Sequence, residues 1–352
     1  MDQLTRRAFL TRTTAGALGC STLAALAGGR SLWAQPAASR RVDIHQHFVS
    51  PSFLQLLTER NAKTPVPGLA AWKGYSPARA IETLDRVGVQ TAMLSITAPG
   101  VWFGDAQEAG RLAREMNEYA TARLVGDHKG RFGLFAVLPL PDVPGSLREI
   151  EYAFDTLKAD GVGVLTSYGS AFLGDASFAP VLAELNRRKA IVYTHPTDSP
   201  CCMNLVPGAA NQMLEYPTDT TRTIVSLLVS EAATKYPDIR FIFSHAGGTI
   251  TSVAGRVLGP TAAPDAFSRP AEPNSRLHHL RRFYYDTAGS ANPVAMSALK
   301  TLVPVSQILF GTDAPFVDGA PQVRGMQAAG FTAAELADIE RGNALRLLQR
   351  NA

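Results

Sequence analysis

The chain has 352 residues, 46% hydrophobic and 18% charged, a composition typical of a globular protein with a large core. Its length suits a single α/β barrel domain. The formal net charge is +4, but the first 34 residues carry four arginines against one aspartate. The remainder therefore has too little excess positive charge to predict a nucleic-acid-binding surface.

Residues 1–38 are expected to be a targeting segment and not part of the fold. Arg6 and Arg7 precede a mildly apolar stretch that runs to Ala27, and this pattern resembles a bacterial twin-arginine export signal. A membrane-anchoring helix is the alternative, but the stretch is short and interrupted by glycines. We therefore expect a periplasmic or otherwise exported protein with no stable membrane span in its mature form, and one functional domain over residues 39–352.

Strand-like and helix-like segments alternate from residue 41 to the C-terminus. Short apolar runs typical of buried strands lie at 41–44, 90–96, 133–138, 161–165, 190–194, 239–244, 283–286 and 307–310. Amphipathic stretches typical of helices lie at 77–87, 106–124, 146–158, 178–188, 218–235 and 293–301. This alternation predicts parallel strands with right-handed crossovers, in either a closed barrel or an open doubly wound sheet.

Two connections in this pattern are unusually long. Residues 197–217 follow the fifth predicted strand and residues 258–277 follow the sixth, and both are rich in residues that favour loops. We expect them to be loops that roof a pocket. The first contains Cys201 and Cys202, which are adjacent and cannot join distant segments, so we expect free thiols.

Four of the predicted strands end in residues that bind metals. His45 and His47 end the first strand, and the other three residues are His195 after the fifth, His245 after the sixth and Asp313 after the eighth. In a closed barrel the carboxyl ends of all strands meet at one rim, whereas an open sheet would spread these ends too far apart to share one ion. The pattern therefore favours a (β/α)8 TIM barrel with one metal centre.

The residue types match a divalent metal site. Residues two apart in a strand point the same way, so His45 and His47 can present both imidazoles to one ion. His195 and Asp313 complete four ligands, the number that a zinc-like site needs, and leave His245 as a proton carrier. Such ligands suit zinc, manganese, cobalt or iron. We expect zinc, with manganese as the alternative. The other histidines, His128, His278 and His279, lie in charged contexts and are expected at the surface.

From about residue 41 to the C-terminus the chain resembles the amidohydrolase superfamily, and within it the branch of aminocarboxymuconate-semialdehyde decarboxylase and related aromatic-acid decarboxylases. Residues 94–101, 113–120 and 215–222 look more narrowly like the 6-methylsalicylate decarboxylases of that branch. The resemblance implies that one divalent metal is bound by His45, His47, His195 and Asp313. It also implies that His245 is catalytic. No lysine follows the fourth predicted strand to bridge a second metal.

The resemblance implies a metal-dependent, non-oxidative decarboxylase of an aromatic hydroxy acid similar to 6-methylsalicylate. In this interpretation Asp313 protonates the ring carbon with His245 as its partner, no organic cofactor is needed, and the protein is a homodimer. The residues expected to contact the small aromatic carboxylic acid are Trp102, Phe103, Arg222 and Phe316. The ligands alone leave open a metal-dependent hydrolase of a lactone, ester or amide, and a non-enzymatic binding protein.

Overall fold

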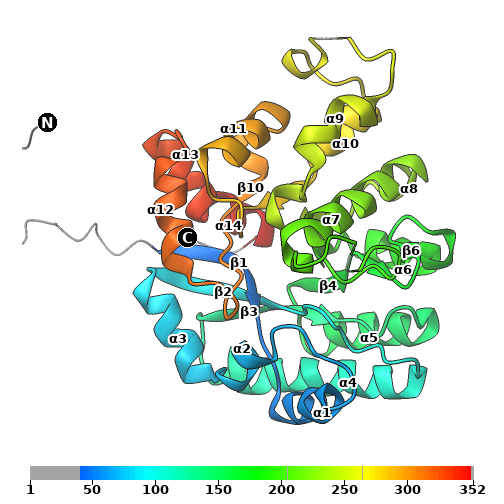
Figure 1. The fold of residues 1–352 in the computed structure, drawn as a ribbon, viewed down its shortest axis with the longest axis vertical. Helices are drawn as coiled ribbons and strands as arrows, with labels where there is room; N and C mark the ends of the chain where they lie inside the picture. The colour runs from blue at the N-terminus through cyan, green and yellow to red at the C-terminus, as the bar shows by residue number, and fades with distance from the viewer. Residues whose placement is uncertain (1–39, 204, 264, 350–352) are drawn as a thin grey trace, which may run out of the picture. The chain divides into compact units, whose positions relative to one another are not determined.

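The computed structural model of the protein describes residues 40–203, 205–263 and 265–349. Eight parallel strands form one sheet in the order β1-β2-β3-β4-β7-β8-β9-β10, with helices outside it (Figure 1). The strands are β1 (Arg41–His47), β2 (Val89–Ser95), β3 (Phe132–Val137), β4 (Gly161–Leu165), β7 (Ile191–His195), β8 (Arg240–Phe243), β9 (Tyr284–Asp286) and β10 (Ile308–Leu309). All eight predicted strands are confirmed. A short antiparallel pair, β5 (Ser167–Tyr168) and β6 (Ala171–Phe172), forms a separate sheet.

Hydrogen bonds between β1 and the segment that follows β10 close the sheet into a barrel. The backbone N–H of Ile44 donates to Phe310 O (2.9 Å), that of Asp313 to His45 O (2.9 Å) and that of His47 to Ala314 O (2.8 Å). The closed alternative of the two predicted folds is therefore correct. Closure also brings two of the predicted metal-binding segments into direct backbone contact.

The helices follow the predicted pattern and pack on the outside of the barrel (Figure 1). Several begin with a side chain that caps the first turn, such as Ser76 before α3 and Asp105 before α4. The helices are α1 (Pro51–Asn61), α2 (Leu69–Lys73), α3 (Pro77–Arg86), α4 (Ala106–Tyr119), α5 (Val143–Asp155), α6 (Ala179–Arg187), α7 (Asn211–Val229), α8 (Ala232–Lys235), α9 (Ile250–Leu258), α10 (Arg276–Arg282), α11 (Pro293–Leu302), α12 (Gly319–Ala328), α13 (Ala333–Ala337) and α14 (Asn343–Leu348).

Two buried clusters make the core. A large one lies between strands and helices, and a smaller one joins inward-facing residues of the strands with Ala344 and Leu347 of α14. The strand residues of the smaller cluster are Val42, Ile44, Met93, Phe135, Ile191, Tyr193, Ile242 and Leu309. Because this cluster fills the barrel interior, a ligand site can open only above it, at the carboxyl ends of the strands.

The long connections differ in part from the prediction. Helix α7 begins at Asn211, so the first loop ends earlier than residue 217, and Pro217 lies inside the helix. The second connection is mostly irregular where the structure describes it, as predicted, and contains the short η4 (Ala266–Ser268) between α9 and α10.

The expectation of free thiols is wrong, because the structure joins Cys201 and Cys202 in a disulfide. Adjacent cysteines cannot link distant segments, but they can still pair with each other. The surface prediction also fails for His279, which is 3% exposed and whose Nε2 lies 2.9 Å from Thr234 Oγ1. His279 faces inward because the short helix α10 buries the side that also carries Leu280.

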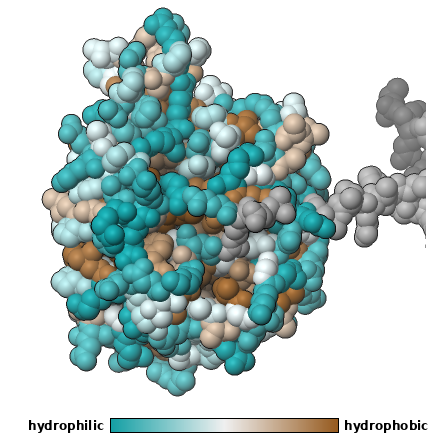
Figure 2. Space-filling model, turned by 180° about the vertical axis from the view of Figure 1, so that it is seen from behind, coloured by the Kyte–Doolittle hydropathy of each residue, from teal (hydrophilic) through white to brown (hydrophobic). Residues whose placement is uncertain are grey.

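On the face drawn in Figure 2, hydrophobic residues are interspersed among hydrophilic ones, as is normal for folded proteins. Within the described ranges, no helix has both the length and the apolar character needed to cross a membrane. The predicted export signal, residues 1–38, lies outside the described residues.

Candidate metal centre

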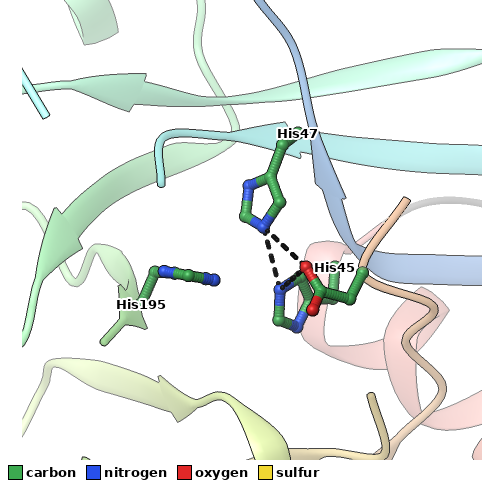
Figure 3. Close-up of side chains that lie close together, drawn as sticks. His45, His47 and His195 are labelled. Atoms are coloured by element: carbon green, nitrogen blue, oxygen red, sulfur yellow. Dashed lines mark hydrogen bonds and ion pairs between the residues drawn. The ribbon is translucent and has the colours of Figure 1, made fainter. Parts of the chain in front are cut away.

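Three elements bring the four predicted ligands together at the carboxyl rim of the barrel. His45 and His47 lie at the end of β1, His195 is the last residue of β7, and Asp313 follows β10. One ligand atom from each of the four lies within 4.8 Å of the others. Figure 3 shows the three imidazoles, two from β1 and one from β7, pointing toward one another. The structure therefore contains the metal site that the sequence predicts.

The spacing of the ligand atoms fits a divalent cation. His45 Nε2 lies 3.0 Å from His47 Nε2, and Asp313 Oδ1 lies 3.3 Å and 3.2 Å from these two nitrogens. Ligand atoms of a tetrahedral site with metal bonds of ~2.0–2.2 Å are about 3.3–3.6 Å apart. Lone pairs packed this closely repel one another unless a proton or a cation lies between them, and the geometry suits a cation.

The hydrogen bonds of the three imidazoles leave their Nε2 atoms free to bind it. Each Nδ1 has an acceptor: Asp286 Oδ2 for His45 (2.9 Å), Ser95 O for His47 (3.2 Å) and Pro196 O for His195 (2.8 Å). An imidazole that donates from Nδ1 keeps its lone pair on Nε2, which is the atom that faces the other ligands. The hydrogen bonds of the three imidazoles therefore already favour the tautomer that a bound metal needs.

Burial and the charges of neighbouring groups shift the pKa values of the four ligand side chains in opposite directions. Burial lowers the pKa of His47, and burial together with the neighbouring imidazoles holds the pKa of His195 well below its usual value. Burial also acts to lower the pKa of His45, but the charges of Asp286 and Asp313 outweigh it and raise that pKa to about 10. Burial opposes ionisation of Asp313, yet the adjacent imidazoles hold its pKa well below the usual range. His45 is thus the one ligand from which a metal must displace a proton near neutral pH.

His245 lies beside the ligands. Its Nε2 is 3.5 Å from Asp313 Oδ2, the carboxylate oxygen that does not face His45 and His47. It lies in a tight turn after β8, in which His245 and Ala246 have positive φ angles of 55° and 56°. Gly248 follows with φ 66°, and a Cβ there would collide with Pro217 O. The Gly-Gly pair therefore allows the turn that brings His245 to Asp313.

A cavity of about 510 Å³ opens above the ligands. Its apolar wall includes Pro67, Ala98 and Val317, and its polar side chains include Thr97, Gln212 and Ser290. His195, His245 and Asp313 reach into it from the metal centre. A volume of this size holds a single substituted aromatic ring.

One of the four predicted substrate contacts lies in this cavity. Phe316 lines it and packs against His47 with ring centroids 5.7 Å apart. Trp102 lines a separate cavity of about 120 Å³, and Phe103 packs against Phe53 beneath Arg60. Arg222 points instead to Cys202 Sγ (3.4 Å). The side chains of Trp102, Phe103 and Arg222 therefore point away from the main cavity and pack against neighbouring elements.

Two groups of residues at the site were not predicted from the sequence. Gln212 and Tyr216 reach the cavity because α7 begins before Pro217, so the helix and not a loop forms this wall. Asp286 ends a predicted strand but is absent from the predicted site. The sequence did contain one indication of its role, because Asp286, like the ligands, is a polar residue at the end of a predicted strand.

A closed barrel of eight parallel strands with one His/Asp centre at its carboxyl rim defines a class, the metal-dependent barrel enzymes. The comparison with known families is more specific. The model of the amidohydrolase family matches residues 42–350, and the chain belongs to this family.

Similar proteins include the 6-methylsalicylic acid decarboxylase of Penicillium expansum, which is 36% identical over 88% of this chain and 96% of the relative. The 6-methylsalicylic acid decarboxylase of Aspergillus aculeatus is also 36% identical, over 89% of this chain and 94% of its own length. Among solved structures, a dihydroxybenzoic acid decarboxylase from a Polaromonas species, with bound manganese and 2-nitroresorcinol, has a TM-score of 0.76. The match covers 88% of this chain and 97% of that one at 21% identity. This structure shows the shared fold.

Proposed function

We propose that the protein is a metal-dependent decarboxylase that removes carbon dioxide non-oxidatively from an aromatic hydroxy acid similar to 6-methylsalicylate. The proposal rests on the observation that the two carboxylate oxygens of Asp313 face different partners. Its Oδ1 faces His45 and His47, whereas its Oδ2 faces His245 and belongs to a residue that lines the cavity. The two relatives named above at 36% identity are 6-methylsalicylic acid decarboxylases.

Decarboxylation breaks the bond between the ring carbon and the carboxylate, and the electron pair stays on the ring until a proton forms the new C–H bond. A bound divalent metal supplies Lewis acidity and a template for the substrate carboxylate or its neighbouring hydroxyl. Asp313 delivers the proton to the ring carbon. That proton leaves in the product, so His245, 3.5 Å from Asp313 Oδ2, passes a new proton from solvent to Asp313 before the next turnover.

The charge of the cavity wall supports a substrate with one carboxylate. Among the described residues that line the cavity there is no lysine or arginine. The negative charge of an aromatic acid must therefore be met at the metal centre, where the carboxylate to be lost has to lie. Phe316 and Tyr216 add aromatic faces that suit a ring carrying a methyl group.

Zinc is the proposed metal and manganese the alternative. Three imidazoles and one carboxylate suit either ion. The solved Polaromonas relative contains manganese. Metal analysis of the purified protein, followed by reconstitution of the stripped protein with each ion, decides between them.

A homodimer is the proposed assembly. In the described structure, five large apolar side chains between residues 203 and 214 are exposed: Met203, Leu205, Val206, Met213 and Leu214. No charged residue occurs between Asp198 and Glu215, so this patch can meet its own copy without like-charge repulsion. Sedimentation of wild type against Met213→Asp tests the assembly, and equal masses at the monomer value would contradict it.

Export through the twin-arginine pathway is the proposed route to the periplasm. The support is the pair Arg6-Arg7 ahead of an apolar, glycine-containing stretch. A protein that binds a metal through three strand ends benefits from folding around the ion before export. Fractionation of cells that express wild type or the Arg6→Lys, Arg7→Lys variant tests the route.

The function is tested by incubating metal-loaded protein with 6-methylsalicylate and a panel of phenolic acids, while released carbon dioxide is measured. We expect carbon dioxide and the corresponding phenol in equal amounts, and no release after chelation of the metal. Turnover of a lactone, ester or amide without carbon dioxide from any phenolic acid would instead establish a hydrolase.

A further inference from the structure

We propose that Asp286 is a positioning residue that joins the metal ligand His45 to the turn that carries His245. Asp286 is the last residue of β9 and has no exposed surface. It neither lines the main cavity nor belongs to the group of four candidate ligands. The part of this inference that concerns His245 rests on the proposed function. The part that concerns metal binding by His45 does not.

The two carboxylate oxygens of Asp286 serve different partners. Oδ2 lies 2.9 Å from His45 Nδ1 and accepts a hydrogen bond from Tyr193 Oη at 3.1 Å. Oδ1 accepts from the backbone N–H of His245 and from that of Ala288, each at 3.0 Å. One buried group therefore contacts the first strand, the turn after β8 and the loop after its own strand.

The contact with His45 selects the atom that binds the metal. A carboxylate can only accept, so His45 Nδ1 must carry the hydrogen, and the lone pair stays on Nε2. That Nε2 is the atom 3.0 Å from His47 Nε2 and 3.3 Å from Asp313 Oδ1. A hydrogen bond from a metal-binding imidazole to a carboxylate also makes the imidazole a stronger ligand.

The contact with His245 holds a strained turn. His245 and Ala246 both have positive φ angles, which residues with a side chain seldom adopt. The backbone N–H of His245, which lies just beyond the end of β8, donates to Asp286 Oδ1. Because the same carboxylate holds the ring of His45, the placement of the proposed proton-transfer group is tied to that of a metal ligand.

The test compares Asp286→Asn with Tyr193→Phe as a matched control. The amide that replaces the carboxylate keeps its shape, but only one of its two ends can accept, so it cannot serve both His45 Nδ1 and the His245 N–H. Tyr193→Phe removes only the hydrogen bond from the Tyr193 hydroxyl and leaves the contacts with His45 and His245 in place. We expect zinc to bind about 10- to 100-fold more weakly to Asp286→Asn, and within about threefold of wild type to Tyr193→Phe. Equal weakening in both variants would overturn the proposal.

A measurement on the unmodified protein covers the case in which Asp286→Asn does not fold. In the zinc-loaded wild type, nitrogen-15 NMR should show His45 bound through Nε2, with a hydrogen on Nδ1 in a strong hydrogen bond. Zinc bound through His45 Nδ1 would refute the proposal whatever the protein's activity.

The link to His245 is tested at saturating zinc, where metal loss no longer contributes. Asp286→Asn should lower kcat by about tenfold or more with little change in KM, because only proton delivery is misplaced. In a His245→Ala background the same change should have almost no further effect on kcat. A full, independent effect there would contradict coupling through His245. If no phenolic acid is turned over at all, the proposed function fails, while zinc affinity and the NMR result still test the role at the metal.

Discussion

The protonation of His45 governs how pH affects metal binding. The charges of Asp286 and Asp313 raise its pKa to about 10, so the metal-free protein holds a proton there at neutral pH. The metal must displace this proton. We expect zinc affinity to rise by about tenfold per pH unit between about pH 6.5 and 9. Calorimetric titration in two buffers of different ionisation enthalpy measures both the affinity and the released proton. An affinity that does not change with pH would exclude this protonation state.

The same pKa shift affects the stability of the metal-free protein with the opposite sign. A histidine whose folded pKa lies above its unfolded value of 6.5 contributes stability that is complete below pH 6.5 and is lost as pH rises through about 10. Urea unfolding of the stripped protein should therefore show falling stability over this range. Increasing pH thus weakens the metal-free fold while it favours metal binding.

The separate roles of two rim histidines can be tested by removing each. His195→Ala removes a ligand, so metal affinity should fall by more than the ~10–100-fold typical of lost outer contacts, and turnover should be lost with it. His245→Ala leaves all four ligands, so the metal should stay bound while kcat falls by about 10²–10⁴-fold. Metal content and carbon dioxide release measure the two effects. Equal metal loss in both variants would contradict the assignment.

The metal ligands could be predicted from sequence because each one lies within three residues of the end of an apolar run, and parallel strands bring their ends to one rim. Asp286 stands at the same kind of position but could not be singled out. A single acidic residue after a strand has many structural explanations, and its value here comes from partners 241 and 41 residues away. Such contacts are set by barrel closure, and no local pattern contains them.

The side chain of Asn117 connects helix α4 to strand β3 and helix α5. This side chain accepts from Val137 N (2.7 Å) and donates to Val137 O (2.9 Å) and to Glu149 Oε1 (2.8 Å). Val137 ends β3, and these bonds pair both its backbone N–H and its carbonyl. Asn117→Ala should therefore leave buried polar groups unpaired and cost about 3 kcal/mol of unfolding free energy.

Chemical denaturation measures this cost, and Asn186→Ala is its control. Asn186 accepts one exposed hydrogen bond, from Asp238 N, so its removal should cost less than about 1 kcal/mol. Equal costs for the two variants would show that Asn117 does not hold these elements together.

The elements themselves were largely predictable because hydrophobic period and length separate strands from helices. The start of α7 was not. Proline normally ends or opens a helix, so Pro217 suggested that the loop continued to that residue. In the structure the helix passes through Pro217, and Thr221 Oγ1 donates to Pro217 O at 3.0 Å. Tertiary packing of this segment overrides the local preference, and the site gains Gln212 and Tyr216.

At the scale of the whole barrel, strands from opposite ends of the chain meet at the seam between β1 and the segment after β10. Besides its backbone bonds, the seam contains the buried carboxylate of Asp43, which accepts from Thr312 Oγ1 (2.6 Å) and from His45 N (2.9 Å). Burial raises the pKa of Asp43 to about 7. The alternation of elements predicted parallel strands, and the count of eight units together with the candidate ligands after the first, fifth, sixth and eighth strands indicated that the sheet closes.

A metal bound by these ligands spans this seam, since His45 and His47 lie on one side, Asp313 on the other, and His195 across the barrel on β7. Such an ion binds the folded chain and stabilises it by about 2.7 kcal/mol when its free concentration is about 100 times its dissociation constant. We therefore expect chelation to lower Tm by roughly 5–10 °C, given the ~2–4 °C per kcal/mol typical of large domains. Calorimetry with and without chelator measures the shift. His245→Ala, which keeps every ligand, should show the same shift, whereas His195→Ala should show almost none. A shift in wild type that persists undiminished in His195→Ala would place the stabilising ion elsewhere.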